Sequence, residues 1–372
     1  MRPEPPDREL LTRVWQHPRR LPHYSVRQWE LLLGQARQSR TLARLARLMA
    51  DLDGGPALPP GAWRHLQCGL RWVERQAHEV LWEIDCIERA LQRVDTPVVL
   101  LKGAAYVAAG LPSARGRLFN DIDILVDIRR LEEAESALMG GGWLSAERDA
   151  YNQRYYREWR HELPPLEHVT RHSFLDVHHT ITAPTSRFAV AGTTLLPRIR
   201  PVGDTGRLFV LDPLDMVLHS AVHLFQEGEF QHGLRDLLDL DDLLIHFAAI
   251  EAGFWPALLD RAAELGLQIP LHHALHHVRR LFGTATPAAL DTRVRALQPN
   301  PVSRALMAWS LAHALQPMHP SCDRPATGFC RGLLYLRAQW LRMPVHLLVP
   351  HLIRKAWRRV FPPEDLHPTL TA

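Results

Sequence analysis

Apolar residues recur at helical spacing through the first part of the chain, up to residue 93. The clearest segment extends from Trp63 to Leu91, where apolar positions alternate at intervals of three and four. These intervals follow the period of an α-helix, so the apolar side chains form one stripe along about eight turns. The pattern predicts a long amphipathic helix within an N-terminal helical segment, residues 1–93.

Short runs of β-branched residues mark the middle of the chain. The stretch "VVLLKG" predicts a strand stopped by Gly103, and a short helix follows it. The stretch "RLFNDIDILVD" predicts a second strand, and residues 129–139 predict an amphipathic helix that ends at a triple glycine. Residues 151–182 predict irregular strands that end in "HSFLDVHHTI". Strands and helices in this alternation predict a small sheet domain, residues 94–210.

Helical periodicity returns after residue 211 and continues toward the end of the chain. The stretches "DPLDMVLHSAVHLF" and "HGLRDLLDLDDLLIHFA" are both amphipathic. Proline-rich breaks near residues 54–60, 197–201 and 317–325 are candidate boundaries. We therefore expect an α+β protein in which a small mixed β-sheet domain is flanked by helical segments. The larger of these is a C-terminal helical domain with a basic tail, residues 211–372.

The composition is that of a globular protein with a mild positive charge. The 372 residues are 46% hydrophobic and 23% charged, and the formal net charge is +4. This charge fits anionic partners such as nucleotides, whereas a long nucleic acid requires a denser basic stripe and is not expected. The N-terminal residues lack the apolar run of a secretory signal. The four cysteines have neither zinc-site spacing nor the number of a disulfide framework, so a reducing, cytoplasmic location is expected: Cys68, Cys86, Cys322 and Cys330.

Two aspartates interrupt the second predicted strand. Asp121 and Asp123 are two residues apart, so on a strand their side chains share one face while Ile122 and Ile124 lie on the other. Like charges repel and burial raises the cost of each, so the pair needs a compensating cation. Mg²⁺ prefers oxygen ligands, commonly one or two carboxylates with substrate phosphates and water. The pattern predicts a magnesium site with a nucleoside triphosphate as substrate.

Two other segments add candidate residues to this site. Gly103 lies where a strand gives way to a helix, and backbone amides there can approach phosphate oxygens. In "HSFLDVH", Asp176 and His178 share one face of the predicted strand. If this strand lies beside the first two, Asp176 becomes a third carboxylate near the metal and can accept a proton from an attacking hydroxyl. His178 is then placed to orient Asp176.

The stretches "LLKGAAY", "RLFNDIDILV" and "FLDVHH" together resemble the nucleotidyltransferase superfamily and, more narrowly, an uncharacterised nucleotidyltransferase family. That family is marked by an LKG turn, an arginine four residues before Asp-Ile-Asp, and a third acid further on. The likeness covers about residues 60–250. The matching residues are Lys102 and Gly103 for the turn, Arg117 for the arginine, Asp121 and Asp123 for the metal ligands, Asp176 for the third acid, and Asp239 for an acid to which we give a structural role.

The resemblance implies a nucleotidyltransferase-like sheet domain and a Mg²⁺-dependent enzyme. In the implied reaction, a hydroxyl acceptor of unknown identity attacks the α-phosphate of a nucleoside triphosphate such as ATP. The nucleoside monophosphate group is transferred and pyrophosphate is released. By resemblance, the catalytic metal ligands are Asp121, Asp123 and Asp176, and the nucleotide-binding residues are Lys102, Gly103 and Arg117.

Two alternatives stay open. Ala104 stands where the superfamily usually has a serine or a second glycine, which favours a nucleotide-binding or regulatory module without catalysis. Residues 331–361 contain seven Arg and Lys residues, no acid, and interleaved tryptophans. Such a segment is typical of a peripheral membrane-surface helix, but also of the basic outer face of a packed helix.

The histidines and Asp127 complete the candidate list. His272 and His276, like His273 and His277, have the spacing of metal ligands on a helix, although core or exposed histidines are the ordinary interpretation. Asp127 is expected to cap the helix that follows it. The other pair at helical spacing, which we expect to pack toward the cleft, is His219 and His223.

Overall fold

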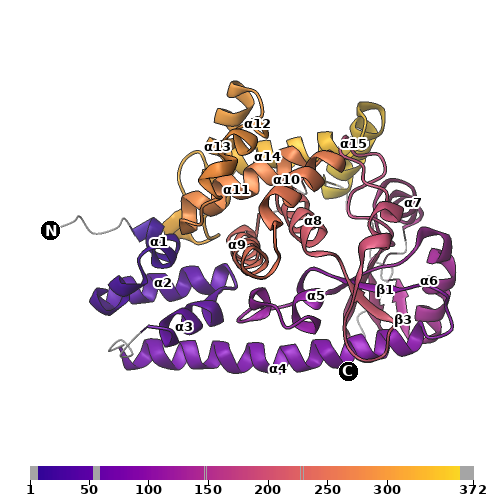
Figure 1. Cartoon of the computed structure of the whole chain (residues 1–372), viewed down its shortest axis with the longest axis horizontal. Helices are drawn as coiled ribbons and strands as arrows, with labels where there is room; N and C mark the ends of the chain where they lie inside the picture. Colours follow the sequence, from indigo (N-terminus) through magenta and orange to yellow (C-terminus); the bar gives the residue numbers. More distant parts are fainter. Residues whose placement is uncertain are drawn as a thin grey trace.

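The computed structural model describes residues 7–52, 59–145, 147, 149–226, 228 and 230–360. One seven-stranded mixed sheet is flanked by helices, which confirms the predicted α+β class. The long helix α4 runs along one side of the molecule, and the helices that follow residue 211 lie on the opposite side (Figure 1). Within the described part of the chain, every strand lies between residues 98 and 210.

The N-terminal segment is helical, as predicted. Its α-helices are α1 (Leu10–Gln16), α2 (Val26–Gln38), α3 (Leu42–Ala50) and α4 (Pro60–Ala90). Helix α2 begins with a capping box, in which Ser25 and Gln28 each accept a hydrogen bond from the other's backbone N–H. The stripe of α4 packs into the core through Leu66, Val80 and Ile84, which are all buried. Along the side of the molecule that it occupies in Figure 1, α4 packs against α2, α3, α5 and α6.

The sheet places two parallel strand pairs around its centre. Its strands are β1 (Val98–Leu101), β2 (Ile122–Leu125), β3 (Trp143–Ser145), β4 (Leu166–His168), β5 (Phe174–His178), β6 (Arg200–Pro201) and β7 (Leu208–Val210). They are ordered β3-β4-β5-β2-β1-β7-β6. Strand β2 is antiparallel to β1 and parallel to β5, and β1 is parallel to β7. The second and third predicted strands are therefore direct neighbours.

Three predicted boundaries are wrong. Strand β1 ends at Leu101, and α5 (Lys102–Ala108) begins at once, so Gly103 lies inside the helix and does not end the strand. Strand β2 begins at Ile122, which leaves Asp121 just before it. Much of the stretch predicted as irregular strands is α7 (Ala150–Trp159), because Asp149 caps this helix by accepting a hydrogen bond from the N–H of Asn152 at 3.0 Å.

The remaining helices confirm the predicted helical C-terminal part. They are α6 (Leu131–Gly140) within the sheet region, and then α8 (Pro213–Gln226), α9 (Gly233–Ile250), α10 (Phe254–Glu264), α11 (Gln268–Phe282), α12 (Asp291–Ala296), α13 (Pro301–Ala314), α14 (Thr327–Arg342) and α15 (Val345–Val360). Helix α8 is buried along most of its length and packs against α9 and α11. Among the described residues, no helix combines the length and apolar character needed to cross a bilayer.

Candidate active site

Parallel pairing of β2 and β5 brings the predicted carboxylates together. The register places Asp123 opposite Asp176, and directly paired residues project from the same face of a sheet. Asp121 precedes β2 by one residue and is exposed at its start. The structure therefore gathers Asp121, Asp123 and Asp176 at one place, with the third acid where the sequence predicted it.

Asp123 is buried and held by two cationic or polar side chains. Its Oδ1 accepts hydrogen bonds from Lys102 Nζ at 2.8 Å and from His178 Nε2 at 3.0 Å. Burial alone raises a carboxyl pKa, but Lys102 and His178 together hold the pKa of Asp123 far below its usual range. Asp123 is therefore ionised, and both bonds fix the orientation of the same carboxylate oxygen.

The pKa values of the two other aspartates are raised in this arrangement. Desolvation and the nearby charge of Asp123 raise the pKa of Asp121. Burial, followed by the charges of Asp123, Glu162 and Asp121, raises the pKa of Asp176 well above its usual value. The negative charges of these three carboxylates repel one another. A cation bound between them would reduce that repulsion. The donors are all oxygens, which suits Mg²⁺.

The LKG turn positions Lys102 by means of an unusual backbone conformation. Lys102 has a φ of 45°, in the left-handed region that residues other than glycine seldom adopt. From there its amine reaches Asp123. Strain of this kind, about 1 kcal/mol or more, persists only where the surroundings impose it. Here the change from β1 to α5 occurs at this residue.

Gly103 has a packing reason to be glycine. A Cβ added there would lie 2.6 Å and 2.7 Å from two ring carbons of Phe119 and 2.9 Å from Nε of Arg117. Both neighbours are buried. The LKG glycine and the arginine before the aspartate pair are therefore parts of one packed unit.

Arg117 forms its ion pair with α9, although its charge also acts on Asp121. Its Nη1 lies 3.0 Å from Oδ2 of Asp239, and its guanidinium lies over the rings of Tyr106 and Phe119. Arg44 of α3 contacts the same Asp239. Arg117 is buried in this pairing, and its predicted contact with phosphate stays a prediction. Asp239 thus has two ion pairs with arginines, and the structural role that was preferred for it stays a prediction.

Sequence reasoning missed two residues of the site and misplaced a third. An isolated bridge pairs Glu162 with His178, so Glu162 and its neighbour His161 lie at the end of β5. Nothing in the sequence marks this pairing across an irregular segment. His178 contacts Asp123, whereas the sequence suggested that it would orient Asp176. His219 of α8 lies near Lys102. Burial and the charge of Lys102 lower the pKa of His219 well below its usual value.

The other candidates keep ordinary roles. Asp127 caps the next turn by accepting a hydrogen bond from the N–H of Arg129 at 2.9 Å, as predicted. Burial lowers the pKa of His272 to about 4 and that of His273 to about 3, so both are neutral packing residues of α11. The four cysteines are free thiols.

A ligand-sized cavity adjoins Asp121, although Asp123 and Asp176 do not line it. Its volume is about 400 Å³, and it lies between α4, the segment that carries Asp121, and residues 171–174. Trp82 and Phe174 contribute apolar surface to it. Cavities of about 300–1,000 Å³ are typical of small-molecule sites. The space beside Asp121 is therefore sufficient for part of a nucleotide or its acceptor.

Comparison with known proteins agrees with this geometry. The model of a family described as uncharacterised nucleotidyltransferase matches residues 25–283. The match includes the carboxylates, the LKG turn and helices α8 to α11, and extends further in both directions than the motifs alone indicated. No curated protein and no solved structure matches the chain. With the family model covering well over half of its residues, the chain belongs to the uncharacterised nucleotidyltransferase family.

Proposed function

We propose that this protein is a Mg²⁺-dependent nucleotidyltransferase that moves a nucleoside monophosphate group from a nucleoside triphosphate to a hydroxyl acceptor. The observation that carries the proposal is the register between β2 and β5, which sets Asp123 opposite Asp176 with Asp121 beside them. Family membership supports nucleotidyl transfer in general. Two observations support the metal. The donor atoms are all oxygens, and the raised pKa values of Asp121 and Asp176 indicate that ionisation of these carboxyl groups is unfavourable without a bound cation.

Each residue has a role that follows from its position. The three aspartates would hold Mg²⁺, which when bound neutralises charge on the phosphates. Lys102 sits beside Asp123 and supplies a further positive charge for phosphate oxygens. As an alternative to holding the metal, Asp176, whose pKa is raised in the absence of an ion, can accept the proton of the acceptor hydroxyl as its oxygen bonds to the α-phosphorus and the bond to pyrophosphate breaks. Gly103 and Arg117 keep the turn and α9 in place around this site.

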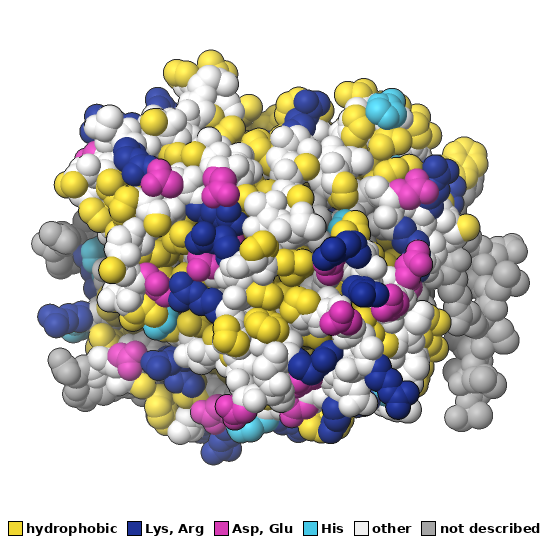
Figure 2. Space-filling view, turned by 45° about the vertical axis from the view of Figure 1, so that its right-hand side comes forward, with side chains coloured by type: hydrophobic (Ala, Val, Ile, Leu, Met, Phe, Trp, Pro, Cys, Tyr) yellow, Lys and Arg dark blue, Asp and Glu magenta, His cyan; other side chains and the backbone are white. Residues whose placement is uncertain are grey.

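The charge distribution on the face shown in Figure 2 favours a small nucleotide over a long nucleic acid. On the face in Figure 2, basic and acidic side chains are interspersed. A nucleic-acid site normally requires basic side chains gathered into a stripe or patch. A nucleoside triphosphate needs only the local charges beside the aspartates.

The transfer reaction can be tested with α-labelled nucleoside triphosphates, Mg²⁺ and a set of small alcohols, sugars and peptides. We expect label in an acceptor and equimolar pyrophosphate. Asp176→Asn should lower the rate by about 10²-fold or more, while Asp204→Asn, in an exposed turn, should leave it unchanged. Metal-dependent nucleotide binding without pyrophosphate release for any acceptor would instead support the inactive module that Ala104 suggested.

A separate observation favours contact with a membrane surface. Helix α15 exposes an apolar stripe at intervals of four residues, formed by Val345, Val349, Ile353 and Trp357. Its opposite side is anchored to α7, where His351 stacks on Tyr155 with ring centroids 4.7 Å apart. The segment from 331 to 361 contains no acid, which suits an anionic lipid surface.

Two basic side chains of this segment already have partners within the protein and are less available for contact with a membrane. Arg337 is largely buried and donates a hydrogen bond to the carbonyl of Phe225 at 3.0 Å, and Arg354 pairs with Asp149. The apolar stripe is therefore the main element of the proposed contact, and the remaining cations assist it. We therefore expect substitution of the apolar residues of this stripe to weaken vesicle binding more than reversal of the basic charges does.

Co-sedimentation with phosphatidylcholine vesicles, with and without phosphatidylserine, tests this contact. The Val349→Glu/Ile353→Glu variant should lose binding to the anionic vesicles. A matched control is Ile245→Glu/Ile250→Glu, which changes two exposed apolar residues of α9 and should keep binding. Equal binding by both variants, or none by the native protein, would refute the contact.

A further inference from the structure

Two histidines and a glutamate cluster behind the aspartate site. His161 and Glu162 follow α7, and the bridge between Glu162 and His178 brings them to the end of β5. All three side chains are buried, and their potential ligand atoms lie within 4.8 Å of one another. Among the described residues, no other three His, Cys, Asp or Glu side chains lie this close together, so the three aspartates are more widely spaced.

The glutamate directs one oxygen between the two imidazoles. Glu162 Oε2 lies 3.6 Å from His161 Nε2 and 3.6 Å from His178 Nε2. Its other oxygen, Oε1, accepts a hydrogen bond from Nε of Arg160 at 3.1 Å, which fixes the carboxylate. An ion bound tetrahedrally at 2.0–2.1 Å from nitrogen and oxygen ligands sets those ligands about 3.3–3.4 Å apart. The two distances from Glu162 Oε2 to the imidazole nitrogens therefore need to shorten only slightly to bind such an ion.

We propose that His161, Glu162 and His178 form a second metal site, which takes Zn²⁺ or another first-row transition-metal dication. Two imidazole nitrogens and one carboxylate are the ligand set of transition metals, whereas Mg²⁺ prefers oxygen. The site is thus chemically distinct from the three aspartates, although it lies beside them. It goes beyond nucleotidyl transfer and does not depend on it.

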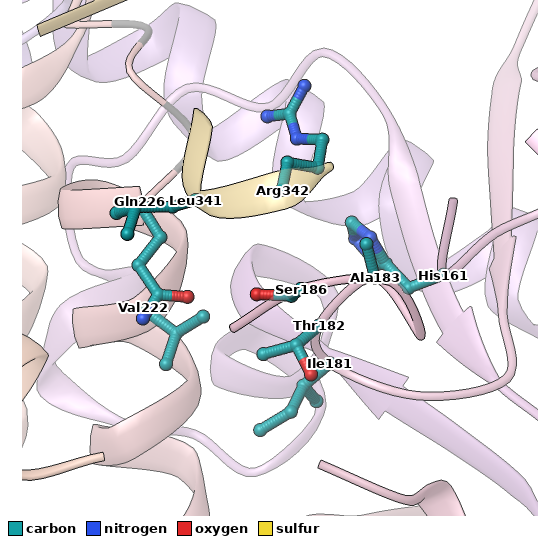
Figure 3. Close-up of a pocket in the computed structure, with 9 residues that line it drawn as sticks. All are labelled: His161, Ile181, Thr182, Ala183, Ser186, Val222, Gln226, Leu341 and Arg342. Atoms are coloured by element: carbon teal, nitrogen blue, oxygen red, sulfur yellow. The ribbon is translucent and has the colours of Figure 1, made fainter. Parts of the chain in front are cut away.

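One of the three proposed ligands, His161, borders a small cavity that Glu162 and His178 do not line. A three-ligand site normally keeps a position for water. The cavity has a volume of about 20 Å³ and is shared with the segment from Ile181 to Ser186 and with α8 and α14 (Figure 3). That volume accommodates about one water molecule. Among the residues that line this cavity, the guanidinium of Arg342 points away from its centre in Figure 3.

Occupation of this site would act on Asp123. His178 Nε2 donates its hydrogen bond to Asp123 Oδ1, and the same nitrogen cannot donate that bond while it coordinates an ion. Metal binding therefore replaces one of the two contacts that hold Asp123. The site links a transition metal to the geometry of the predicted catalytic carboxylates.

Metal content of the full chain provides the test. The protein would be equilibrated with Zn²⁺ or with Mg²⁺, desalted, and analysed by elemental mass spectrometry, and Co²⁺ would be titrated while its visible absorption is recorded. We expect one Zn²⁺ per chain, no retained Mg²⁺, and Co²⁺ bands of nitrogen–oxygen coordination. His161→Ala should lower Zn²⁺ affinity by more than about 100-fold, the upper effect of a supporting residue.

Controls separate this site from the aspartates and from misfolding. His276→Ala, in the other histidine cluster, and Asp121→Asn should both leave Zn²⁺ binding unchanged. Glu162→Gln, which preserves shape, should weaken binding even if His161→Ala does not fold. The proposal is overturned if native protein retains no Zn²⁺, or if His161→Ala and Glu162→Gln bind it as the native protein does.

Discussion

Replacement of Gly103 by alanine tests whether the LKG glycine is required for packing. The added methyl would lie 2.6 Å and 2.7 Å from carbons of the Phe119 ring. The backbone of Phe119 cannot shift easily, because its N–H donates to Oε1 of Gln76 at 2.8 Å and its carbonyl accepts from Nε2 of the same residue at 2.6 Å. Phe119 is also buried. The collision must therefore displace Phe119, Arg117 or α5.

The expected free-energy change follows from two opposing effects. Overpacking of a core costs about 1–3 kcal/mol, and contacts below 3 Å with a buried ring put this case in the upper part of that range. Alanine in a helix is favoured over glycine by about 1 kcal/mol. Gly103→Ala should therefore lower the free energy of unfolding by about 1–2 kcal/mol.

Urea denaturation followed by circular dichroism measures this change. Gly332→Ala is the matched control, since Gly332 lies within α14 and an added Cβ there meets nothing within 4 Å. The control should be stabilised by about 0.5–1 kcal/mol. If both variants are stabilised alike, the packing explanation is refuted, and close approach of the backbone to phosphate becomes the better reason for the glycine.

Three further changes have predictable outcomes. Burial raises the pKa of Asp241 to about 6; the ionised form is then the less stable one in the fold, so Asp241→Asn should stabilise the protein by about 3 kcal/mol at pH 8 in thermal or urea unfolding. This gain should disappear as the pH falls through 6 toward 4, and a gain independent of pH would contradict the assignment. Arg44→Met leaves Asp239 with one cationic partner and should cost about 2–3 kcal/mol in urea unfolding, whereas Arg75→Met, at an exposed helix pair, should cost under about 0.5 kcal/mol. Lys102→Met should weaken calorimetric binding of a nucleoside triphosphate by about tenfold or more, because a charge beside Asp123 is lost; unchanged affinity would exclude Lys102 from phosphate binding.

The main elements and the carboxylate site could be predicted because their signals are local. Side chains of a strand alternate between its two faces, which identifies the residues that share a face with Asp123. The alternating spacing of three and four from Trp63 to Leu91 predicts α4. Asp176 was then placed correctly once its strand was assumed to lie beside β2. Each inference needed only a few neighbouring residues.

The parts that were missed depend on contacts distant in sequence or on tertiary context. Arg117 was predicted to bind phosphate, but its ion pair with Asp239, which lies on α9 far along the chain, was not foreseen. Glu162 joins the site through a single bridge to His178. Helix α7 is rich in tyrosine, which favours strands intrinsically, and its assignment rests on a cap at Asp149 and on packing against α15.

The central claim is tested most directly by calorimetric titration of a non-hydrolysable nucleoside triphosphate, with and without Mg²⁺. The native protein and Asp204→Asn should bind only when Mg²⁺ is present, and Asp123→Asn should bind at least about tenfold more weakly because it removes a charged ligand. Circular dichroism would establish that each variant is folded. Binding of equal strength to Asp123→Asn, or binding that does not require Mg²⁺, would contradict the account of a metal-dependent nucleotide site at the three aspartates.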